Sequence, residues 1–343
     1  MRRADFSYQL PVELIADRPL PRRGASRLLG LDGATGALVD LRFADLGSLL
    51  RPGDLLVLND TRVLPARLVL RRGTGGAVEV LLLEPMSADA RTWSALVRPS
   101  RKLRDGEIVA SDDGALRVVI GARLDDDGVR AIELDTDDDV LAALARHGRA
   151  PLPPYITEPL ADPERYQTVY ATRPASSAAP TAGLHLTPAV LDALETLGIG
   201  VARVELVVGL DTFKPVTVDD PADHRMHTEA YRVAPEVLER CAATKAAGGR
   251  VVAVGTTSVR ALESAAVRGP SGRTDLFIRR PYDFRVVDVL LTNFHLPRTT
   301  LLVMIDAFVG PRWRSLYETA LANGYRFLSF GDAMLLTRAR SSS

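Results

Sequence analysis

The chain has 343 residues and a formal net charge of zero, because 43 lysines and arginines balance 43 aspartates and glutamates. Apolar residues make up 46% and charged residues 25%, values typical of globular domains, which excludes disordered, collagen-like and disulfide-scaffold classes. The balanced charge gives no global field of the kind that marks many nucleic-acid-binding or membrane-binding proteins. The length predicts one large domain with a smaller one.

The single cysteine, Cys241, cannot form an internal disulfide, which indicates a reducing compartment. No stretch approaches the roughly 18 consecutive apolar residues of a membrane span, and the first residues contain no apolar run of signal-peptide length. We therefore expect a cytoplasmic protein without a membrane partner.

The first sixty residues predict short elements that lead into a buried strand. The apolar run 54–58 stops at Asn59-Asp60-Thr61-Arg62, which is typical of a strand with polar groups at its carboxyl end. The elements before it are a helical stretch, two strands and a helical turn, at 11–16, 28–31, 37–43 and 45–50.

Residues 63–149 differ in character from the rest of the chain. Short alternating runs at 77–83, 92–97 and 116–120 are separated by glycine-rich and aspartate-rich turns. Several short strands at regular spacing predict a small β-barrel.

From residue 150 to the end, helices alternate with apolar strands. This alternation predicts an α/β sheet layered with helices, formed by 1–62 and 150–343, with the barrel at 63–149 inserted into it. The predicted helices lie at 188–197, 235–247 and 258–266, and the strands at 201–208, 250–254 and 286–291.

Gly255-Thr256-Thr257-Ser258 follows the strand at 250–254 and leads into a helix. Free backbone N–H groups at a helix start, together with Thr and Ser hydroxyls, form a site for a carboxylate or phosphate, although a well-capped helix has the same pattern. The endings of a Walker loop and of a dinucleotide-binding turn are both absent here.

Three other polar clusters are predicted to follow strands: 59–62, Thr292-Asn293-Phe294-His295, and Ser329-Phe330-Gly331-Asp332. Ligands of open α/β sheets gather at the carboxyl ends of the strands. The four clusters together therefore predict one binding rim.

Histidines occur in two loops. His185 ends the small-residue loop at 176–184, and His224, His227 and Glu229 lie within six residues of one another. The second group lacks the helical spacing and the further ligand of a zinc site, so we expect no metal. General acid or base chemistry by His185 or His227 is the favoured interpretation.

Taken together, these segments resemble the S-adenosylmethionine:tRNA ribosyltransferase-isomerase family of the queuosine pathway. The resemblance extends almost from end to end, which makes coincidence implausible. It is carried by Asp5-Phe6, Leu10-Pro11, Ala25-Ser26-Arg27-Leu28 and residues 52–63, 151–156, 164–170, 178–185, 226–229, 253–260, 292–297 and 331–334.

The resemblance implies a catalytic α/β domain interrupted by a β-barrel. It also implies that the ribosyl part of S-adenosylmethionine, a co-substrate, is transferred to the 7-aminomethyl-7-deazaguanine base of tRNA and isomerised. Epoxyqueuosine would form while adenine and methionine leave. We expect tRNA as the partner and a monomeric protein.

Such a reaction needs a base beside the sulfonium, a donor for departing adenine and a clamp for the methionine carboxylate. We expect the clamp at residues 255–258 with Arg260, and proton transfer by His185, His227 and Glu229. The other expected cofactor-binding residues are Asn59, Asp60 and Asn293, which would contact adenosine, together with Arg62, Thr181 and His295.

Five positions depart from the family pattern that the resemblance implies, and three of them are Ala175, Ser177 and Leu186, where glycine, valine and phenylalanine are expected. Val207 stands where a histidine is expected, and Asp211 where a glycine is expected. The negative charge of Asp211 would repel anionic RNA at a site that must accept it. Two alternatives therefore stay open: a relative that uses the same cofactor on another acceptor, and a cofactor-binding or RNA-binding protein without turnover.

Overall fold

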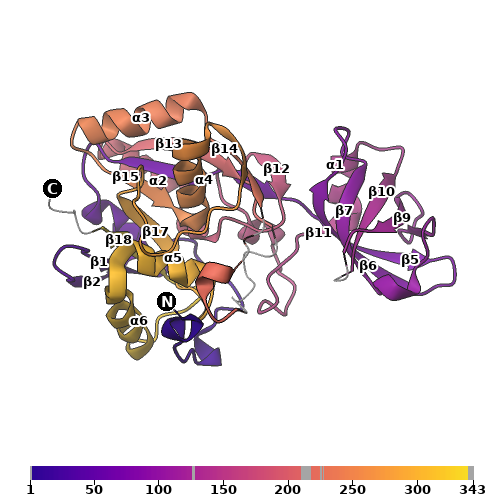
Figure 1. The fold of residues 1–343 in the computed structure, drawn as a ribbon, viewed down its shortest axis with the longest axis horizontal. Helices are drawn as coiled ribbons and strands as arrows, with labels where there is room; N and C mark the ends of the chain where they lie inside the picture. Colours follow the sequence, from indigo (N-terminus) through magenta and orange to yellow (C-terminus); the bar gives the residue numbers. More distant parts are fainter. Residues whose placement is uncertain (1, 126–127, 210–217, 225, 227, 339–343) are drawn as a thin grey trace. The chain divides into compact units, whose positions relative to one another are not determined.

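The computed structural model describes residues 2–125, 128–209, 218–224, 226 and 228–338 (Figure 1). The chain divides into two compact units. The first contains Met1–Arg62, Pro154–Arg173 and Ala179–Ser343, and the second contains Val63–Pro153 and Pro174–Ala178. Residues 150–153 and 174–178 thus belong to the second unit, although the sequence analysis assigned both to the α/β domain.

The first unit is built on a nine-stranded mixed sheet. Its central strands β13, β3, β15 and β17 are parallel, and β3, β15 and β17 are buried along their whole length because helices and loops cover both faces. The strand order is β16 (Ser271–Thr274), β14 (Glu229–Arg232), β13 (Gly200–Leu206), β3 (Leu55–Asn59), β15 (Val251–Val254), β17 (Val289–Asn293), β18 (Ala333–Thr337), β1 (Arg27–Leu31) and β2 (Leu38–Arg42).

Helix α4 packs across β13, β3, β15 and β17 (Figure 1). It begins at Gly255, three residues before the predicted start, so the polar cluster at 255–258 is the first turn of the helix. The α-helices are α1 (Val140–His147) in the second unit and α2 (Pro188–Thr196), α3 (Pro235–Ala246), α4 (Gly255–Arg268), α5 (Thr300–Val309) and α6 (Trp313–Ala322) in the first. The short 3₁₀ helices are η1 (Arg3–Phe6), η2 (Val12–Leu14), η3 (Phe43–Leu49), η4 (Ser100–Lys102), η5 (Pro163–Tyr166), η6 (Thr181–His185), η8 (Pro221–Asp223) and η9 (Gly310–Arg312).

One face of the sheet carries the main apolar cluster. Leu56 and Leu58 of β3 point to this face, as expected from the alternation of side chains along a strand, and Phe43 and Leu46 of η3 and Leu194 of α2 cover them. All five side chains are almost completely buried. Among the described residues, no helix is both long enough and apolar enough to span a membrane.

The polar residues 329–332 reach the sheet in a way that the sequence analysis did not predict. They precede β18, whereas the analysis placed them after a strand. β18 is antiparallel to β17, with Ala333 opposite Asn293, so the amino end of β18 lies beside the carboxyl end of β17. The Asp332 carboxylate accepts the backbone N–H groups of Arg27 and Arg326, at 2.7 and 2.8 Å, and this holds the turn.

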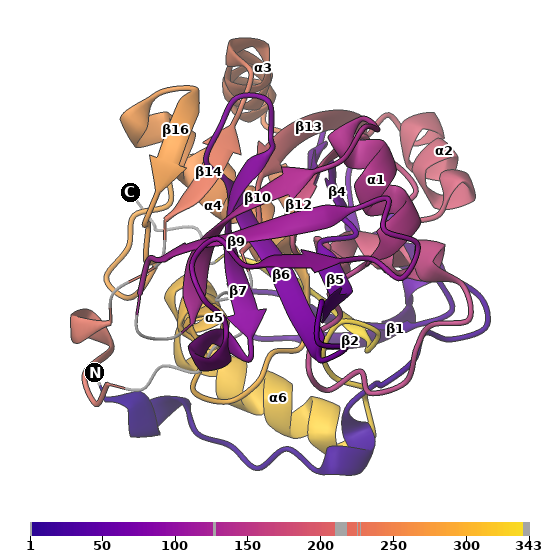
Figure 2. The ribbon, with the colours of Figure 1, turned by 90° about the vertical axis from the view of Figure 1, so that its right-hand side faces the viewer.

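The second unit is a closed antiparallel barrel of six strands, because β5 pairs with both β6 and β8 (Figure 2). Strand β11 extends the sheet beside β5. The barrel strands are β5 (Arg67–Arg72), β6 (Ala77–Pro85), β7 (Thr92–Arg98), β10 (Val129–Asp135), β9 (Arg117–Arg123) and β8 (Ile108–Ala110), with β11 at Gly148–Arg149. A separate two-stranded sheet joins β4 (Thr61–Val63) and β12 (Arg173–Ser176). The predicted fold class, a layered α/β domain with a small β-barrel, is confirmed.

Truncation of Leu56 tests the central role of β3 in the first unit. We expect Leu56→Ala to lower the free energy of unfolding by about 2–5 kcal/mol, because the removed atoms leave a cavity in a covered face. The measurement is urea unfolding in a Trp93→Phe background, where Trp313 of α6 is the only remaining tryptophan.

The matched control is Val267→Ala in α4, whose side chain is 59% exposed. This substitution should change the free energy of unfolding by no more than about 0.5 kcal/mol. Equal losses in the two variants would show that the Leu56 face is not the packed core.

Candidate active site

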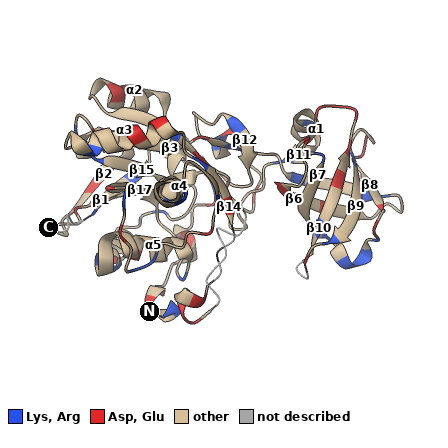
Figure 3. Cartoon of the chain, turned by 45° about the horizontal axis from the view of Figure 1, so that its top comes forward, with Lys and Arg blue, Asp and Glu red and all other residues tan. Residues whose placement is uncertain are grey.

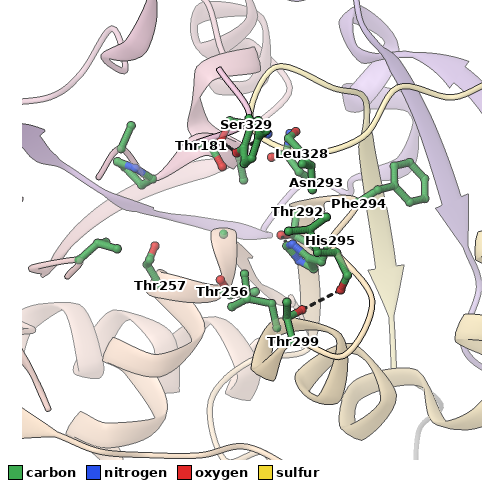
Figure 4. A pocket seen from close by; sticks show the side chains of 18 residues that line it. Thr181, Thr256, Thr257, Thr292, Asn293, Phe294, His295, Thr299, Leu328 and Ser329 are labelled. Atoms are coloured by element: carbon green, nitrogen blue, oxygen red, sulfur yellow. Dashed lines mark hydrogen bonds between the residues drawn. The ribbon is translucent and has the colours of Figure 1, made fainter. Parts of the chain in front are cut away.

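A cavity of about 660 Å³, part of it open to solvent, lies in the first unit at the rim of the sheet (Figure 4). Its walls come from the loop that leads into η6, the first turn of α4, the end of β17 and the turn before β18. Six of the residues predicted from sequence line it: Thr181, Gly255, Thr256, Thr257, Asn293 and His295. Part of the expected set of residues therefore lies together in one cavity.

The amino end of α4 forms one side of the cavity. Gly255 has φ +86°, a left-handed conformation that favours glycine, and the preceding residue, Val254, supplies no side-chain cap. The N–H groups of the first helical turn therefore lack intrahelical acceptors. The hydroxyl of Thr257, a residue that is 8% exposed, also has no partner. A carboxylate bound here would satisfy these donors and would be favoured by the helix dipole.

Asn293, at the end of β17, lines the cavity and has an unused acceptor. Its Nδ2 donates to the carbonyl of Leu328 at 3.0 Å and to Nε2 of His185 at 3.1 Å, whereas its Oδ1 has no partner. A carbonyl oxygen can only accept, so the Leu328 carbonyl determines which end of the amide faces it. The residue is 2% exposed, and a buried unpaired acceptor is rare unless a ligand completes it.

His185 lies behind Asn293. Its Nε2 accepts from Asn293, so the ring proton of the neutral form is on Nδ1 and is donated to Oγ of Ser26 at 2.7 Å. Burial lowers the pKa of His185 to about 4, and the ring stacks on Phe43 with centroids 4.9 Å apart. His185 is a predicted proton-transfer residue, but both of its ring nitrogens have protein partners. This geometry favours a positioning role.

His295 lines the same cavity and is also neutral, because burial lowers its pKa to about 3. Its Nε2 is 3.2 Å from Oγ1 of Thr292, and its backbone N–H donates to the hydroxyl of Tyr317. The hydroxyl of Tyr8 donates to its carbonyl oxygen. These contacts hold the loop after β17.

Four predicted cofactor-binding residues lie away from the cavity lining and have structural contacts. Asn59 bonds both backbone groups of Leu206 and thereby joins β3 to β13. Asp60, whose pKa is raised by burial, accepts from Thr172. Arg62 forms an ion pair with Glu164, and Ser258 donates to the carbonyl of Val254 one turn earlier. The expected role of these four residues in cofactor binding stays a prediction.

Arg260 and Glu229 form a buried ion pair, with side chains that are 5% and 6% exposed. Arg260 also donates to the carbonyls of Leu276 and Thr274, and Glu229 accepts the N–H of Gly209. Their charges therefore stabilise each other inside the protein, and neither residue lines the cavity. The expected carboxylate clamp at Arg260 and proton transfer by Glu229 stay predictions, and this arrangement favours a structural role for the pair.

Two positions that the sequence analysis singled out, His227 and Asp211, lie outside the described residues. Val207, which departs from the family pattern, is half-buried and donates its backbone N–H to the carbonyl of Ala230. The described part of the chain contains no group of three or more His, Cys, Asp or Glu residues that could hold a metal.

Tyr155 and Leu328 line the cavity but were not predicted as site residues. Tyr155 follows a proline-rich connection and bonds its hydroxyl to Oγ of Ser329, which was placed in a rim cluster. Leu328 has φ +71°, a conformation rare for leucine, and no sequence signal marks it.

A second cavity, of about 330 Å³, also belongs to the first unit. His185 and Ser329 line it, together with three arginines, Arg22, Arg23 and Arg165. No acidic side chain is among its described lining residues. Figure 3 shows that charges of both signs are otherwise interspersed over the described chain.

Comparisons with known proteins identify the family of this chain. A family model described as "Queuosine biosynthesis protein" matches residues 3–336. A relative from Symbiobacterium thermophilum, named S-adenosylmethionine:tRNA ribosyltransferase-isomerase, is 50% identical over 98% of this chain and 100% of its own length. A relative of the same name from Azoarcus sp. is 51% identical over 97% of each chain.

A solved structure from Thermotoga maritima, described as an S-adenosylmethionine tRNA ribosyltransferase, is 36% identical to this chain. The match covers 97% of this chain and 99% of that one, with a TM-score of 0.56. Family model and relatives thus match nearly the whole chain. The chain therefore belongs to the queuosine biosynthesis protein family and is an enzyme of its ribosyltransferase-isomerase class.

Proposed function

We propose that this enzyme transfers the ribosyl part of S-adenosylmethionine to the 7-aminomethyl-7-deazaguanine base of tRNA and isomerises it, giving epoxyqueuosine, adenine and methionine. The observation that carries the proposal is the cavity at the rim of the sheet. It combines an anion-binding helix end at α4 with a buried, unpaired acceptor at Asn293. The names of the relatives support the cofactor and the acceptor.

The methionine part of the cofactor suits the amino end of α4. Its carboxylate would accept from the N–H groups of the first turn, which have no intrahelical acceptors, and from the Thr257 hydroxyl, which has no protein partner. This replaces the clamp expected at Arg260, whose guanidinium pairs with Glu229.

The second cavity supports an anionic acceptor. Arg22, Arg23 and Arg165 line it, and Ser329 lines both cavities. Arg23 and Arg165 already donate to backbone carbonyls, so their positive charge, and not a set of free donors, would favour a phosphate of the tRNA backbone at this position.

A base must remove a proton beside the sulfonium, which already acidifies it. His185 and Glu229 are engaged by protein partners, so we propose His227 for this step. A His227→Ala variant that kept full single-turnover activity would remove His227 from the mechanism.

The first test is release of adenine and methionine from S-adenosylmethionine, with and without tRNA that carries the aminomethyl-deazaguanine base. We expect release that requires this tRNA, with one adenine released per base modified. Release without tRNA would instead favour a different acceptor, and no release under either condition would favour a binding protein.

A substitution at Gly255 tests the position of the carboxylate. We expect Gly255→Ala to weaken S-adenosylmethionine binding by on the order of 10-fold or more, because its Cβ would lie 3.3 Å from Oγ1 of Thr257 and disturb the helix end. The measurement is isothermal titration calorimetry.

The control for the Gly255 variant is Gly53→Ala. Gly53 has a similar φ of +89°, and a Cβ there would meet no atom within 4 Å. Both substitutions introduce a left-handed alanine, which costs about 1–2 kcal/mol of stability. Only the Gly255 variant should lose affinity, and equal affinity in both would place the carboxylate elsewhere.

The low pKa of His185 predicts a stability change with pH. The unfolded chain binds a proton at His185 near pH 6.5, whereas the folded protein does so only near pH 4. The contribution of His185 is therefore fully present above pH 6.5 and is lost as the pH falls toward 4, by up to about 1.4 kcal/mol per pH unit.

Comparison with His185→Gln isolates this contribution, because glutamine stays neutral and His295 is present in both proteins. We expect the free energy of unfolding of the native protein to fall more steeply between pH 6.5 and 4 than that of the variant. Parallel curves would show that His185 is not buried as a neutral ring.

A further inference from the structure

We propose that Asn293 Oδ1 accepts a hydrogen bond from the 6-amino group of the adenine ring and so determines that the enzyme uses an aminopurine cofactor and rejects a 6-oxopurine analogue. This inference rests on the proposed function, because it concerns how the same cavity recognises S-adenosylmethionine.

The orientation of the Asn293 amide is determined before any ligand binds. Both hydrogens of Nδ2 are used, one by the Leu328 carbonyl at 3.0 Å and one by His185 Nε2 at 3.1 Å. A flipped amide would place Oδ1 against the Leu328 carbonyl, which can only accept, and is therefore disfavoured. Oδ1 is left as the atom without a partner, on a residue that lines the cavity.

The groups behind Asn293 are also held in place. Ser26, His185 and Asn293 are 4%, 6% and 2% exposed and form one hydrogen-bonded chain. Leu328 adopts a left-handed conformation, φ +71°, while its carbonyl accepts from Asn293. Such a backbone conformation is unfavourable for leucine and persists where the surroundings impose it, as they often do at ligand sites.

The unpaired oxygen suits a neutral N–H donor. S-adenosylmethionine has two donor groups, the 6-amino group and the α-ammonium group. The α-ammonium group is adjacent to the carboxylate, which we place at α4, and Figure 4 shows Thr256 and Thr257 on one side of the cavity and Asn293 with Leu328 and Ser329 on another. The uncharged 6-amino group is therefore the donor that fits Asn293.

The same oxygen opposes a 6-oxopurine. An oxo group at position 6 would direct its lone pairs at Oδ1, and two buried acceptors would then face each other without a proton between them. Sites built to bond a substrate N–H reject analogues that lack it far more strongly than apolar pockets reject a change of shape.

The hydrogen bond should act on binding and not on the chemical step. It adds electron density to adenine, which does not help adenine to leave, and it is present before and after the glycosidic bond breaks. Removal of Asn293 Oδ1 should therefore raise the KM for S-adenosylmethionine and leave kcat within a few-fold of the native value.

The test is calorimetric titration of the native protein with S-adenosylmethionine and with S-inosylmethionine, in which the 6-amino group is replaced by an oxo group. We expect the inosyl analogue to bind more weakly by on the order of 10-fold or more. In Asn293→Ala, S-adenosylmethionine should bind more weakly and the ratio of the two affinities should approach one. Val267→Ala, an exposed change in α4 outside the cavity, should keep the native ratio.

His185→Ala should reduce the affinity ratio, because Asn293 loses one of the two acceptors that orient it. His185→Gln should restore the ratio, because its amide oxygen can take the place of Nε2. A purely structural role for His185 would change stability in both variants without this restoration, and unfolding midpoints measured in parallel separate the two effects.

Equal binding of the two cofactors by the native protein would overturn the inference, with no variant needed. Absence of binding for S-adenosylmethionine itself would instead overturn the proposed function. The two failures are therefore distinguishable in one titration series.

Discussion

The antiparallel pairing of β18 with β17 determines the shape of the site. Because Ala333 lies opposite Asn293, the turn before β18 is placed beside the end of β17. That turn can approach so closely only with glycine at 331, where a Cβ would lie 2.4 Å from the carbonyl of Arg326. The Leu328 carbonyl thereby reaches the Asn293 amide, and one wall of the cavity forms.

Burial controls the charge of the groups around the cavity. His185 and His295 are neutral because desolvation lowers their pKa values, and the one buried arginine that was expected to bind the cofactor is paired with Glu229. The positive end of α4 is consequently the feature of the described lining that favours an anion. A cavity of this kind can bind a zwitterion and still keep its other end suited to an uncharged purine.

Sequence patterns were informative wherever a local rule applied. The buried strands at β3 and β15, the helix after Thr187 and the polar start of α4 all follow from hydrophobic runs and capping residues close together in the chain. The expectation of a small barrel was also local, because it depended on the spacing of short alternating strands. The family resemblance added the cofactor, which no periodicity indicates.

The roles of single polar residues were harder to predict from the sequence. Asn59, Arg260 and Glu229 have residue types suited to binding, but each is engaged by a partner from a distant segment. His185 shows the same limit, since Ser26 lies 159 residues away and Asn293 lies 108 residues away. A free and a satisfied polar side chain look identical in sequence.

The sequence by itself determined the fold class and the family, because hydrophobic periodicity and ordered motifs are properties of the chain. Only the tertiary structure decided which polar atoms are left without partners, namely Oδ1 of Asn293 and Oγ1 of Thr257 among those that line the cavity. The reason is physical: hydrogen-bond satisfaction depends on neighbours that folding brings together from distant parts of the chain.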